Sequence, residues 1–172
     1  KDPKENIVFL LEISSFQLEF INHFTPDILV YTNISPDHLD RHGSMEEYIN
    51  MKLNALMNMK DKGQIVYNKD DAILEKVLSP FPHKKQPFST KSKDVLYKID
   101  NKNIIGPSDD KLLNIDELSI PGEHNLQNFL AASTCSHLMG ISQNQIVRTL
   151  KEFKGVEHRL EYVRTINNVK YI

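Results

Sequence analysis

Two unbroken apolar runs near the start of the chain constrain its fold more than any other feature. Residues 7–11 read IVFLL and residues 28–31 read ILVY. A strand with one face in water alternates apolar and polar residues, whereas a strand between two layers of helices is apolar throughout. Both runs are therefore predicted to be buried strands of a mostly parallel sheet flanked by helices.

The rest of the chain alternates helical and strand patterns, as an α/β fold requires. Phe16, Phe20 and Phe24 recur every four residues and predict a helix that Pro26 ends, which completes a β-α-β unit. Further helices are predicted at residues 45–60, 70–78, 125–139 and 143–153. Further strands are predicted at residues 64–68, 160–166 and 169–172.

Short β-like segments indicate a small antiparallel β subregion between the sheet and the later helices. They lie at residues 95–99, 103–105 and 118–120, separated by turns, and Pro80, Pro82 and Pro87 predict a loop before them. Two of the helices carry a capping box in their first turn. The boxes are Ser44 with Glu47 and Ser142 with Gln145.

Composition excludes several classes of protein. The 172 residues carry a net charge of −2, so no large basic field exists for nucleic acids or anionic lipid surfaces. The single cysteine, Cys135, allows no internal disulfide, and no apolar run approaches the roughly 20 residues of a membrane span. We expect a cytoplasmic protein that binds neither nucleic acid nor membrane. The lysines at 84, 85, 91 and 93 are interpreted as a solvated face.

The residues after the predicted strand at 28–31 form the first candidate site. Residues 37–42 read DHLDRH and hold five ionisable side chains. Ligands of open parallel sheets bind beyond the carboxyl ends of the strands, where loops vary on a rigid base. Asp37, Asp40 and Arg41 are better explained as a local ion-pair cluster that caps the next helix. His38 can ligate a metal or bind a substrate, or it can be a structural loop histidine.

A second polar group follows the run at residues 7–11. Glu12 ends that run, and Ser14, Ser15 and Gln17 follow it directly. If the two strands are neighbours, His38 lies at the same sheet edge as Glu12. Carboxylate oxygens beside substrate phosphates suit Mg²⁺. The alternative is that a serine caps the helix while Glu12 is solvated.

Lys52 is the most anomalous residue of the helix predicted at 45–60. Its helical neighbours Tyr48, Ile49, Ala55 and Leu56 are apolar or aromatic. Burial of an ammonium group without a partner is expensive. By periodicity alone, we prefer the interpretation that the aliphatic part of the Lys52 side chain lies on the core while its ammonium group reaches water.

Two polar positions near the C-terminal end are candidates for nucleotide contacts. Asn125 follows Gly122 at the start of a predicted helix, where it can bond a base or cap the helix. Arg159 closes a glycine-containing loop, where it can meet a ribose or a phosphate.

Taken together, these segments resemble the central, ATP-binding domain of the Mur ligase family in order and spacing. They are residues 12–19 (EISSFQLE), 33–41 (NISPDHLDR), 48–52 (YINMK), 122–125 (GEHN) and 158–159 (HR). SSFQLE and DHLDRH most resemble the branch that adds D-glutamate to UDP-N-acetylmuramoyl-L-alanine. Another Mur ligase, or the related folylpolyglutamate synthase, is the alternative within this group.

The resemblance implies an ATP-dependent amide ligation in peptidoglycan biosynthesis by a monomeric enzyme. A substrate carboxylate takes the γ-phosphoryl group of ATP, the amine of D-glutamate attacks the acyl phosphate, and phosphate leaves a tetrahedral intermediate. The implied roles are Mg²⁺ binding for Glu12 and His38, carbamylation and a second Mg²⁺ for Lys52, muramoyl-substrate contacts for Ser14 and Gln17, and nucleotide contacts for Asn125 and Arg159. Lys52 and His38 would thus serve catalysis.

The chain also departs from the family pattern. None of its glycines is followed by lysine and then Ser or Thr, so the P-loop segment is missing. Residues 1–172 are predicted to be a single domain excised from a longer protein, without the N-terminal UDP-binding and C-terminal amino-acid-binding domains. We expect these residues alone to be inactive and to bind ATP weakly at best.

Two other functions compete with the ligase. One is a metal-dependent nucleotide phosphohydrolase that uses Glu12, His38 and Asp40. The other is a non-catalytic nucleotide-binding module in which Lys52 merely extends to solvent.

Overall fold

The computed structural model describes residues 7–156 and 163–171, which fall into two compact units. The first, called the helical unit, comprises residues 1–29 and 35–63. The second, called the sheet unit, comprises residues 30–34 and 64–172. That residues 1–172 form one domain of a longer protein stays a prediction.

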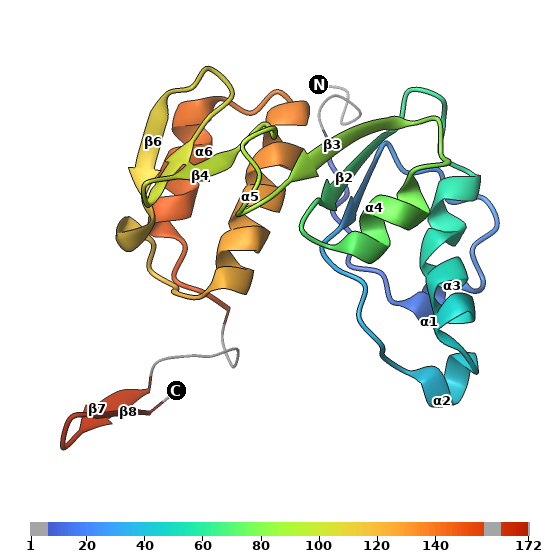
Figure 1. The fold of residues 1–172 in the computed structure, drawn as a ribbon, viewed down its shortest axis with the longest axis horizontal. Coiled ribbons are helices and arrows are strands. Elements are labelled where there is room, and N and C mark those ends of the chain that lie inside the picture. Colours follow the sequence, from blue (N-terminus) through green and yellow to red (C-terminus); the bar gives the residue numbers. More distant parts are fainter. Residues whose placement is uncertain (1–6, 157–162, 172) are drawn as a thin grey trace. The chain divides into compact units, whose positions relative to one another are not determined.

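The described part of the helical unit contains three helices. They are α1 (Ser15–Leu18), α2 (Leu39–His42) and α3 (Met45–Met57) (Figure 1). α3 contacts both of the shorter helices. Ser44 begins α3 by accepting a hydrogen bond from the backbone N–H of Glu47 at 3.2 Å, as its capping sequence predicts. The helix predicted at residues 45–60 is confirmed, although it ends earlier, at Met57.

The apolar run at residues 7–11 forms no strand, so this prediction and the β-α-β unit built on it are wrong. Phe9 and Leu10 are 81% and 90% exposed. An apolar run becomes a strand only when a neighbouring strand pairs with its backbone, and no strand in the described part of the chain does so here. The predicted phenylalanine helix shrinks to α1, because Phe20 is exposed and a short helix depends on burial.

The predicted parallel sheet is confirmed. Its strands, in spatial order, are β1 (Ile28–Tyr31), β2 (Gln64–Asn68) and β3 (Lys84–Phe88). β2 and β3 run parallel, with Gln64 opposite Lys84. Ile65 and Val66 are consecutive and fully buried, so both faces of β2 are covered. α4 (Ala72–Leu78) and α5 (Glu123–Leu138) both contact β2.

The loop predicted around Pro87 is wrong, because Pro87 lies within β3 opposite Tyr67. β3 comes last in the spatial order of the described strands. A strand at an edge has one side of its backbone unpaired, and on that side a missing N–H costs no ladder hydrogen bond.

A separate antiparallel sheet confirms the predicted β subregion. Its strands, in order, are β4 (Lys98–Asp100), β5 (Asn103–Ile105) and β6 (Lys111–Asn114). β6 was not predicted, and its four residues carry only two apolar side chains. The strand predicted at residues 118–120 is wrong: Leu118 N–H donates to the carbonyl of Ile115 at 3.2 Å, which continues the turn of η1 (Ile115–Glu117).

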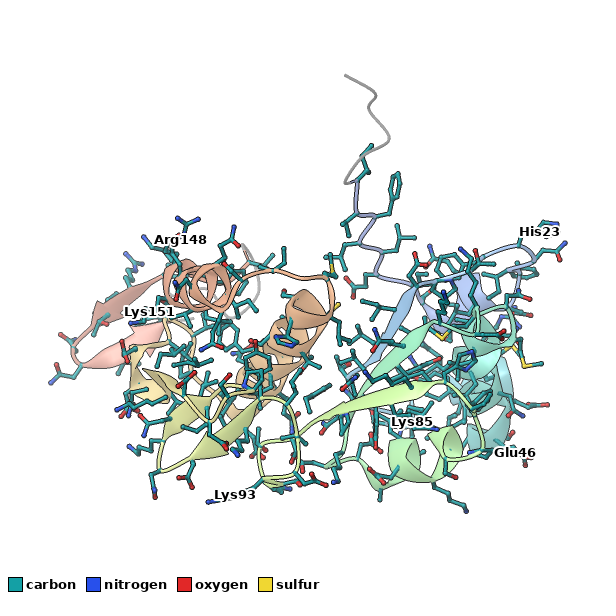
Figure 2. The ribbon with its side chains drawn as sticks, turned by 90° about the horizontal axis from the view of Figure 1, so that it is seen from above. His23, Glu46, Lys85, Lys93, Arg148 and Lys151 are labelled. Atoms are coloured by element: carbon teal, nitrogen blue, oxygen red, sulfur yellow. The ribbon has the colours of Figure 1, made fainter. Side chains whose placement is uncertain are left out.

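The later elements follow their predictions closely. α5 and α6 (Gln143–Glu152) match the two predicted helices, and the Ser142 capping box of α6 is present. β7 (Arg164–Ile166) and β8 (Val169–Tyr171) pair as an antiparallel hairpin, while residues 160–162 of the predicted strand lie outside the described residues. Among the helices described, none is long and apolar enough to cross a membrane. Charged side chains such as Glu46 and Arg148 lie at the outside of the ribbon (Figure 2).

A polar cluster joins the ends of β2 and β3. Asp70 accepts hydrogen bonds from the Ser89 hydroxyl at 2.6 Å and from the Thr90 backbone N–H at 2.9 Å. Ser89, which is fully buried, in turn accepts from the N–H groups of Lys91 and Ser92. One carboxylate therefore fixes the backbone where the chain leaves two neighbouring strands.

Replacing Asp70 by alanine is expected to lower the free energy of unfolding by roughly 2–4 kcal/mol, because a buried hydroxyl and a backbone N–H lose their acceptor. Urea unfolding followed by circular dichroism measures the change. Asp110→Ala is the control, since Asp110 is exposed, and a change within about 0.5 kcal/mol is expected for it. Equal effects of the two substitutions would contradict the role of Asp70.

The turn between β4 and β5 stores backbone strain. Asn101 and Lys102 have φ of 46° and 62°, which is left-handed backbone. Lys102→Gly is expected to raise the free energy of unfolding by about 0.5–1 kcal/mol: relief of about 1–2 kcal/mol of strain exceeds the conformational entropy cost of glycine, about 0.5–1 kcal/mol. Lys102→Ala keeps the strain, and both variants lose the exposed ion pair with Asp116. A gain with alanine as large as with glycine would rule out backbone strain as the cause.

Candidate functional site

A cavity of about 430 Å³ in the helical unit gathers most of the predicted site residues. Its lining consists of Glu12, Ile13, Ser14, Ser15, Gln17, Asp37, His38, Tyr48 and Lys52. Five of the seven predicted site residues are therefore found together. They come from the segment before α1, from α1 itself, from the loop before α2 and from α3.

Ser14 and Gln17 hold each other at the start of α1. The Ser14 hydroxyl accepts from the Gln17 backbone N–H at 3.3 Å, and the Gln17 side-chain oxygen accepts from the Ser14 N–H at 2.9 Å. This reciprocal cap satisfies two backbone donors that the helix cannot satisfy itself. Ser14 is thus the helix cap that the alternative interpretation expected, and the cap also fixes two exposed polar side chains at the cavity wall.

His38 has an unusual backbone. Its φ of 51° and ψ of 31° lie in the left-handed region, which few residues other than glycine adopt. Asp37 accepts a hydrogen bond from the His38 backbone N–H at 2.9 Å, and its other oxygen lies 3.4 Å from His38 Nε2. The His38 ring also contacts the Phe16 ring, with 4.8 Å between centroids. Backbone strain of this kind persists only where the surroundings fix it, as they do at functional sites.

The rest of the charged cluster has separate positions. Arg41 donates to Glu19 at 2.9 Å, an exposed ion pair that joins α2 to α1. Asp40 lies in the first turn of α2, outside the described lining of the cavity. The geometry of Arg41 and Asp40 therefore supports structural roles.

Lys52 lies on α3 with its side chain at the cavity. Its Nζ lies 4.9 Å from the centroid of the Tyr48 ring, one helical turn earlier. This is a cation–π contact, which attracts an ammonium group to the face of an aromatic ring. Lys52 is only partly buried. Its position agrees with an aliphatic chain that lies on the core and an ammonium group that reaches the open cavity.

The cavity offers Mg²⁺ few protein ligands. Among the described residues, no three His, Cys, Asp or Glu side chains converge on one point. Glu12 and His38 supply one carboxylate and one imidazole to the same cavity. Mg²⁺ commonly takes one or two protein carboxylates and completes its shell with water and substrate phosphates, so the residues present fit such a site.

The two predicted nucleotide contacts are not part of this cavity as described. Asn125 lies in the first turn of α5, where its side-chain amide donates to the Pro121 carbonyl at 2.7 Å. That bond is not a helix cap, because a cap accepts from the N–H groups of the first turn and α5 has no side-chain cap there. The predicted nucleotide contact of Asn125 stays a prediction. Arg159 lies outside the described residues.

Sequence reasoning missed a buried histidine behind the cavity wall. His42 is 8% exposed, and its Nε2 lies 3.0 Å from the hydroxyl of Ser15. Its ring stacks on Phe16 with 5.3 Å between centroids and contacts Tyr48 at 5.4 Å. The available signal was its place four residues after His38, one helical turn along the same face.

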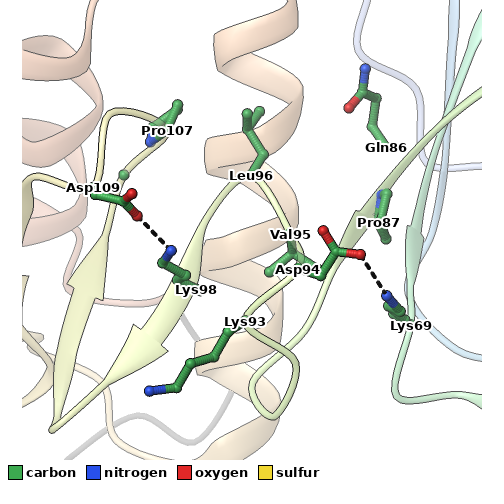
Figure 3. Close-up of a pocket in the computed structure, with 11 residues that line it drawn as sticks. Lys69, Gln86, Pro87, Lys93, Asp94, Val95, Leu96, Lys98, Pro107 and Asp109 are labelled. Atoms are coloured by element: carbon green, nitrogen blue, oxygen red, sulfur yellow. Dashed lines mark hydrogen bonds and ion pairs between the residues drawn. The ribbon is translucent and has the colours of Figure 1, made fainter.

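A second cavity, of about 390 Å³, lies in the sheet unit and contains no predicted site residue (Figure 3). Its three lysines are already paired: Lys69 Nζ lies 3.7 Å from Asp94, Lys98 Nζ lies 2.5 Å from Asp109, and Lys93 pairs with Asp100, which is outside the lining. These pairs give the cavity wall a nearly balanced charge. The cavity of the helical unit is therefore the candidate site.

Two curated relatives of this chain carry the same name. The UDP-N-acetylmuramoylalanine–D-glutamate ligase of Thermoanaerobacter sp. (strain X514) is 43% identical over 174 residues, covering 99% of this chain and 38% of that protein. The enzyme of the same name from Clostridioides difficile (strain 630) is 42% identical over 171 residues, covering 98% of this chain and 38% of that protein. The chain thus spans less than half the length of these relatives.

Solved structures of low sequence identity share the fold. A UDP-N-acetylmuramoyl-L-alanyl-D-glutamate–2,6-diaminopimelate ligase superposes with a TM-score of 0.70 at 23% identity, over 90% of this chain and 34% of its own. The UDP-N-acetylmuramoylalanyl-D-glutamyl-2,6-diaminopimelate–D-alanyl-D-alanyl ligase of Acinetobacter baumannii gives 0.67 at 18% identity, over 83% of this chain and 32% of its own.

A family model described as the Mur ligase middle domain matches residues 2–136. The match contains every residue of the candidate site in the helical unit. It confirms the resemblance seen in the sequence and the fold class that the resemblance implies. The chain belongs to the Mur ligase family.

Proposed function

We propose that the protein containing this chain is an ATP- and Mg²⁺-dependent ligase that adds D-glutamate to UDP-N-acetylmuramoyl-L-alanine in peptidoglycan biosynthesis. The cavity that collects Glu12, Ser14, Gln17, His38 and Lys52 carries the proposal. The names of the relatives at 43% and 42% identity support the choice of D-glutamate. The parts of those relatives that this chain does not cover would supply the remaining binding sites.

The reaction would proceed in two steps. The alanine carboxylate of the sugar nucleotide attacks the γ-phosphorus of ATP, forming an acyl phosphate and releasing ADP. The amine of D-glutamate then attacks the acyl carbon, loses a proton, and phosphate leaves as the amide forms.

The side chains of α1 would orient the muramoyl substrate. The Ser14 hydroxyl and the Gln17 amide are held to each other by the helix cap and face solvent at the cavity. Because the cap fixes both groups before the substrate arrives, little side-chain entropy remains to be lost on binding.

Glu12 and His38 would hold Mg²⁺, and Asp37 would keep the His38 ring in place. When bound, Mg²⁺ neutralises charge on the transferring phosphoryl group and aligns the attacking and leaving oxygens. The strained backbone of His38 supports this role, since strain is tolerated where a side chain must point at a ligand.

Lys52 would act as a carbamate. Its unprotonated amine attacks CO₂, a new N–C bond forms, and the nitrogen loses a proton, which leaves an anionic oxygen donor at the end of the side chain. Asp37 also lines the cavity but is engaged by His38, and no three His, Cys, Asp or Glu side chains converge among the described residues, so the metal site would need a further oxygen ligand. A carbamate on Lys52 would supply it from α3, beside Glu12 and His38.

The same substrates suit a cytoplasmic enzyme, because ATP and UDP-linked sugars are cytoplasmic compounds. Action as a monomer stays a prediction. The phosphohydrolase alternative has less support, because Asp40, its third residue, is outside the described cavity lining.

Phosphate release by the full-length protein is expected to require ATP, Mg²⁺, UDP-N-acetylmuramoyl-L-alanine and D-glutamate together. Coupled phosphate detection with mass spectrometry of the amide product measures this. Phosphate release from ATP alone would identify a phosphohydrolase. Binding of nucleotide with no turnover under the complete mixture would identify a binding module.

Glu12→Gln is expected to raise the Mg²⁺ concentration for half-maximal activity by roughly tenfold or more, because it removes a charged ligand. Gln17→Ala should instead raise KM for the muramoyl substrate and leave the Mg²⁺ requirement unchanged. Glu46→Gln, an exposed change in the first turn of α3, is the control. An unchanged Mg²⁺ titration in the Glu12 variant would remove Glu12 from the metal site.

A further inference from the structure

The buried ring of His42 lies between the two helices that border the candidate cavity. It stacks on Phe16 of α1 at an interplanar angle of 8°, and it also contacts Tyr48 of α3. Its Nε2 forms a buried hydrogen bond with Ser15, the first residue of α1, which is 3% exposed. One side chain of α2 thus binds both α1 and α3.

The neighbours of His42 are themselves neighbours of the proposed metal site. Phe16 contacts the His38 ring at 4.8 Å, and Tyr48 carries the Lys52 ammonium 4.9 Å from its centroid. The contacts form an unbroken series, which we call the aromatic series. It consists of His38, Phe16, His42, Tyr48 and Lys52.

The backbone of α2 connects His42 to His38 a second time. The His42 N–H donates to the His38 carbonyl at 3.0 Å, across the single turn that makes up this helix. His38 keeps a left-handed backbone, and α2 is only four residues long. A helix this short cannot hold a strained residue by its own hydrogen bonds, so its packing must do so.

His42 itself is not among the described residues that line the cavity. It therefore does not touch substrate or metal there, and it acts through the residues that do. Its exposed neighbour Arg41 also joins α2 to α1, but through an ion pair in water. Such pairs contribute little to geometry or stability.

We propose that His42 is a positioning residue that sets the relative placement of His38 and Lys52 through Phe16 and Tyr48, with Ser15 as its anchor. The inference rests on the proposed function, because it assumes that His38 and Lys52 serve a divalent metal site. Aromatic stacking and a buried hydrogen bond both depend steeply on geometry, so together they specify one arrangement of three short segments.

The test uses the full-length protein and Mn²⁺ as the metal probe, in the presence of ADP. Free Mn²⁺ is measured by electron paramagnetic resonance, and carbamate on Lys52 by ¹³C NMR after addition of ¹³C-bicarbonate. The variants are His42→Ala, His42→Phe, Ser15→Ala and the double variant Ser15→Ala/His42→Phe. Arg41→Ala is the matched control on the same helix, and all proteins are compared at temperatures where circular dichroism shows them folded.

The expected results separate positioning from mere stability. His42→Ala should weaken Mn²⁺ binding by about tenfold and reduce the carbamate signal. Ser15→Ala and His42→Phe should each cause a smaller loss, and the double variant should lose no more than the larger single loss, because both changes remove the same hydrogen bond. Arg41→Ala should bind Mn²⁺ as the unchanged protein does.

Two outcomes would overturn the inference, and they are distinguishable. If Glu12→Gln weakens Mn²⁺ binding while the folded His42 variants bind it normally, the metal site stands and His42 has no positioning role. If the unchanged protein shows no Mn²⁺ binding that depends on Glu12, the proposed function fails and the inference fails with it.

Discussion

The candidate site depends on α3, because α1 and α2 are too short to form by themselves. Each has four residues, whereas an isolated helix in water becomes marginally stable only at about 12–15 residues. Both contact α3, which has its own N-terminal cap at Ser44 and buries Tyr48, Ala55 and Leu56. The cavity-lining side chains of α1 and of the loop that leads into α2 therefore owe their positions to packing on one longer helix.

The backbone of His38 shows what this arrangement costs. A left-handed residue with a side chain is destabilised by about 1–2 kcal/mol relative to ordinary helical backbone. Four contacts compensate: Asp37 accepts from its N–H, Arg41 and His42 donate to its carbonyl, and Phe16 packs on its ring. The His38 side chain faces the cavity and adds no buried area to the hydrophobic core. Its strained backbone is therefore better explained by a need to place this side chain at the cavity than by a gain in stability.

The success of sequence-based prediction depended on whether a segment finds its partner nearby. β2 was predicted at its observed bounds, because both of its faces are buried and a short helix leads directly to its neighbour β3. Residues 7–11 are just as apolar, yet they are exposed. Apolar composition reports what a segment would gain from burial, and it does not report whether a partner surface exists. The loop predicted around Pro87 was wrong for a different reason. Residue type alone does not reveal which strand lies at the edge of a sheet, where a proline is tolerated.

The charged motif at residues 37–42 identified the right segment, but only part of it lines the cavity. Asp37 and His38 are there, Arg41 pairs with Glu19, and His42 is buried behind the wall. A common site for Glu12 and His38 was predicted from neighbouring strand ends and from the family resemblance, whereas Lys52 was added through the resemblance alone, and the roles of all three stay predictions. The contact between His42 and Ser15 joins positions 27 residues apart and leaves no pattern in residue type or spacing. Charge locates such a site in a sequence, whereas the buried contacts that determine its geometry emerge only from the packed structure.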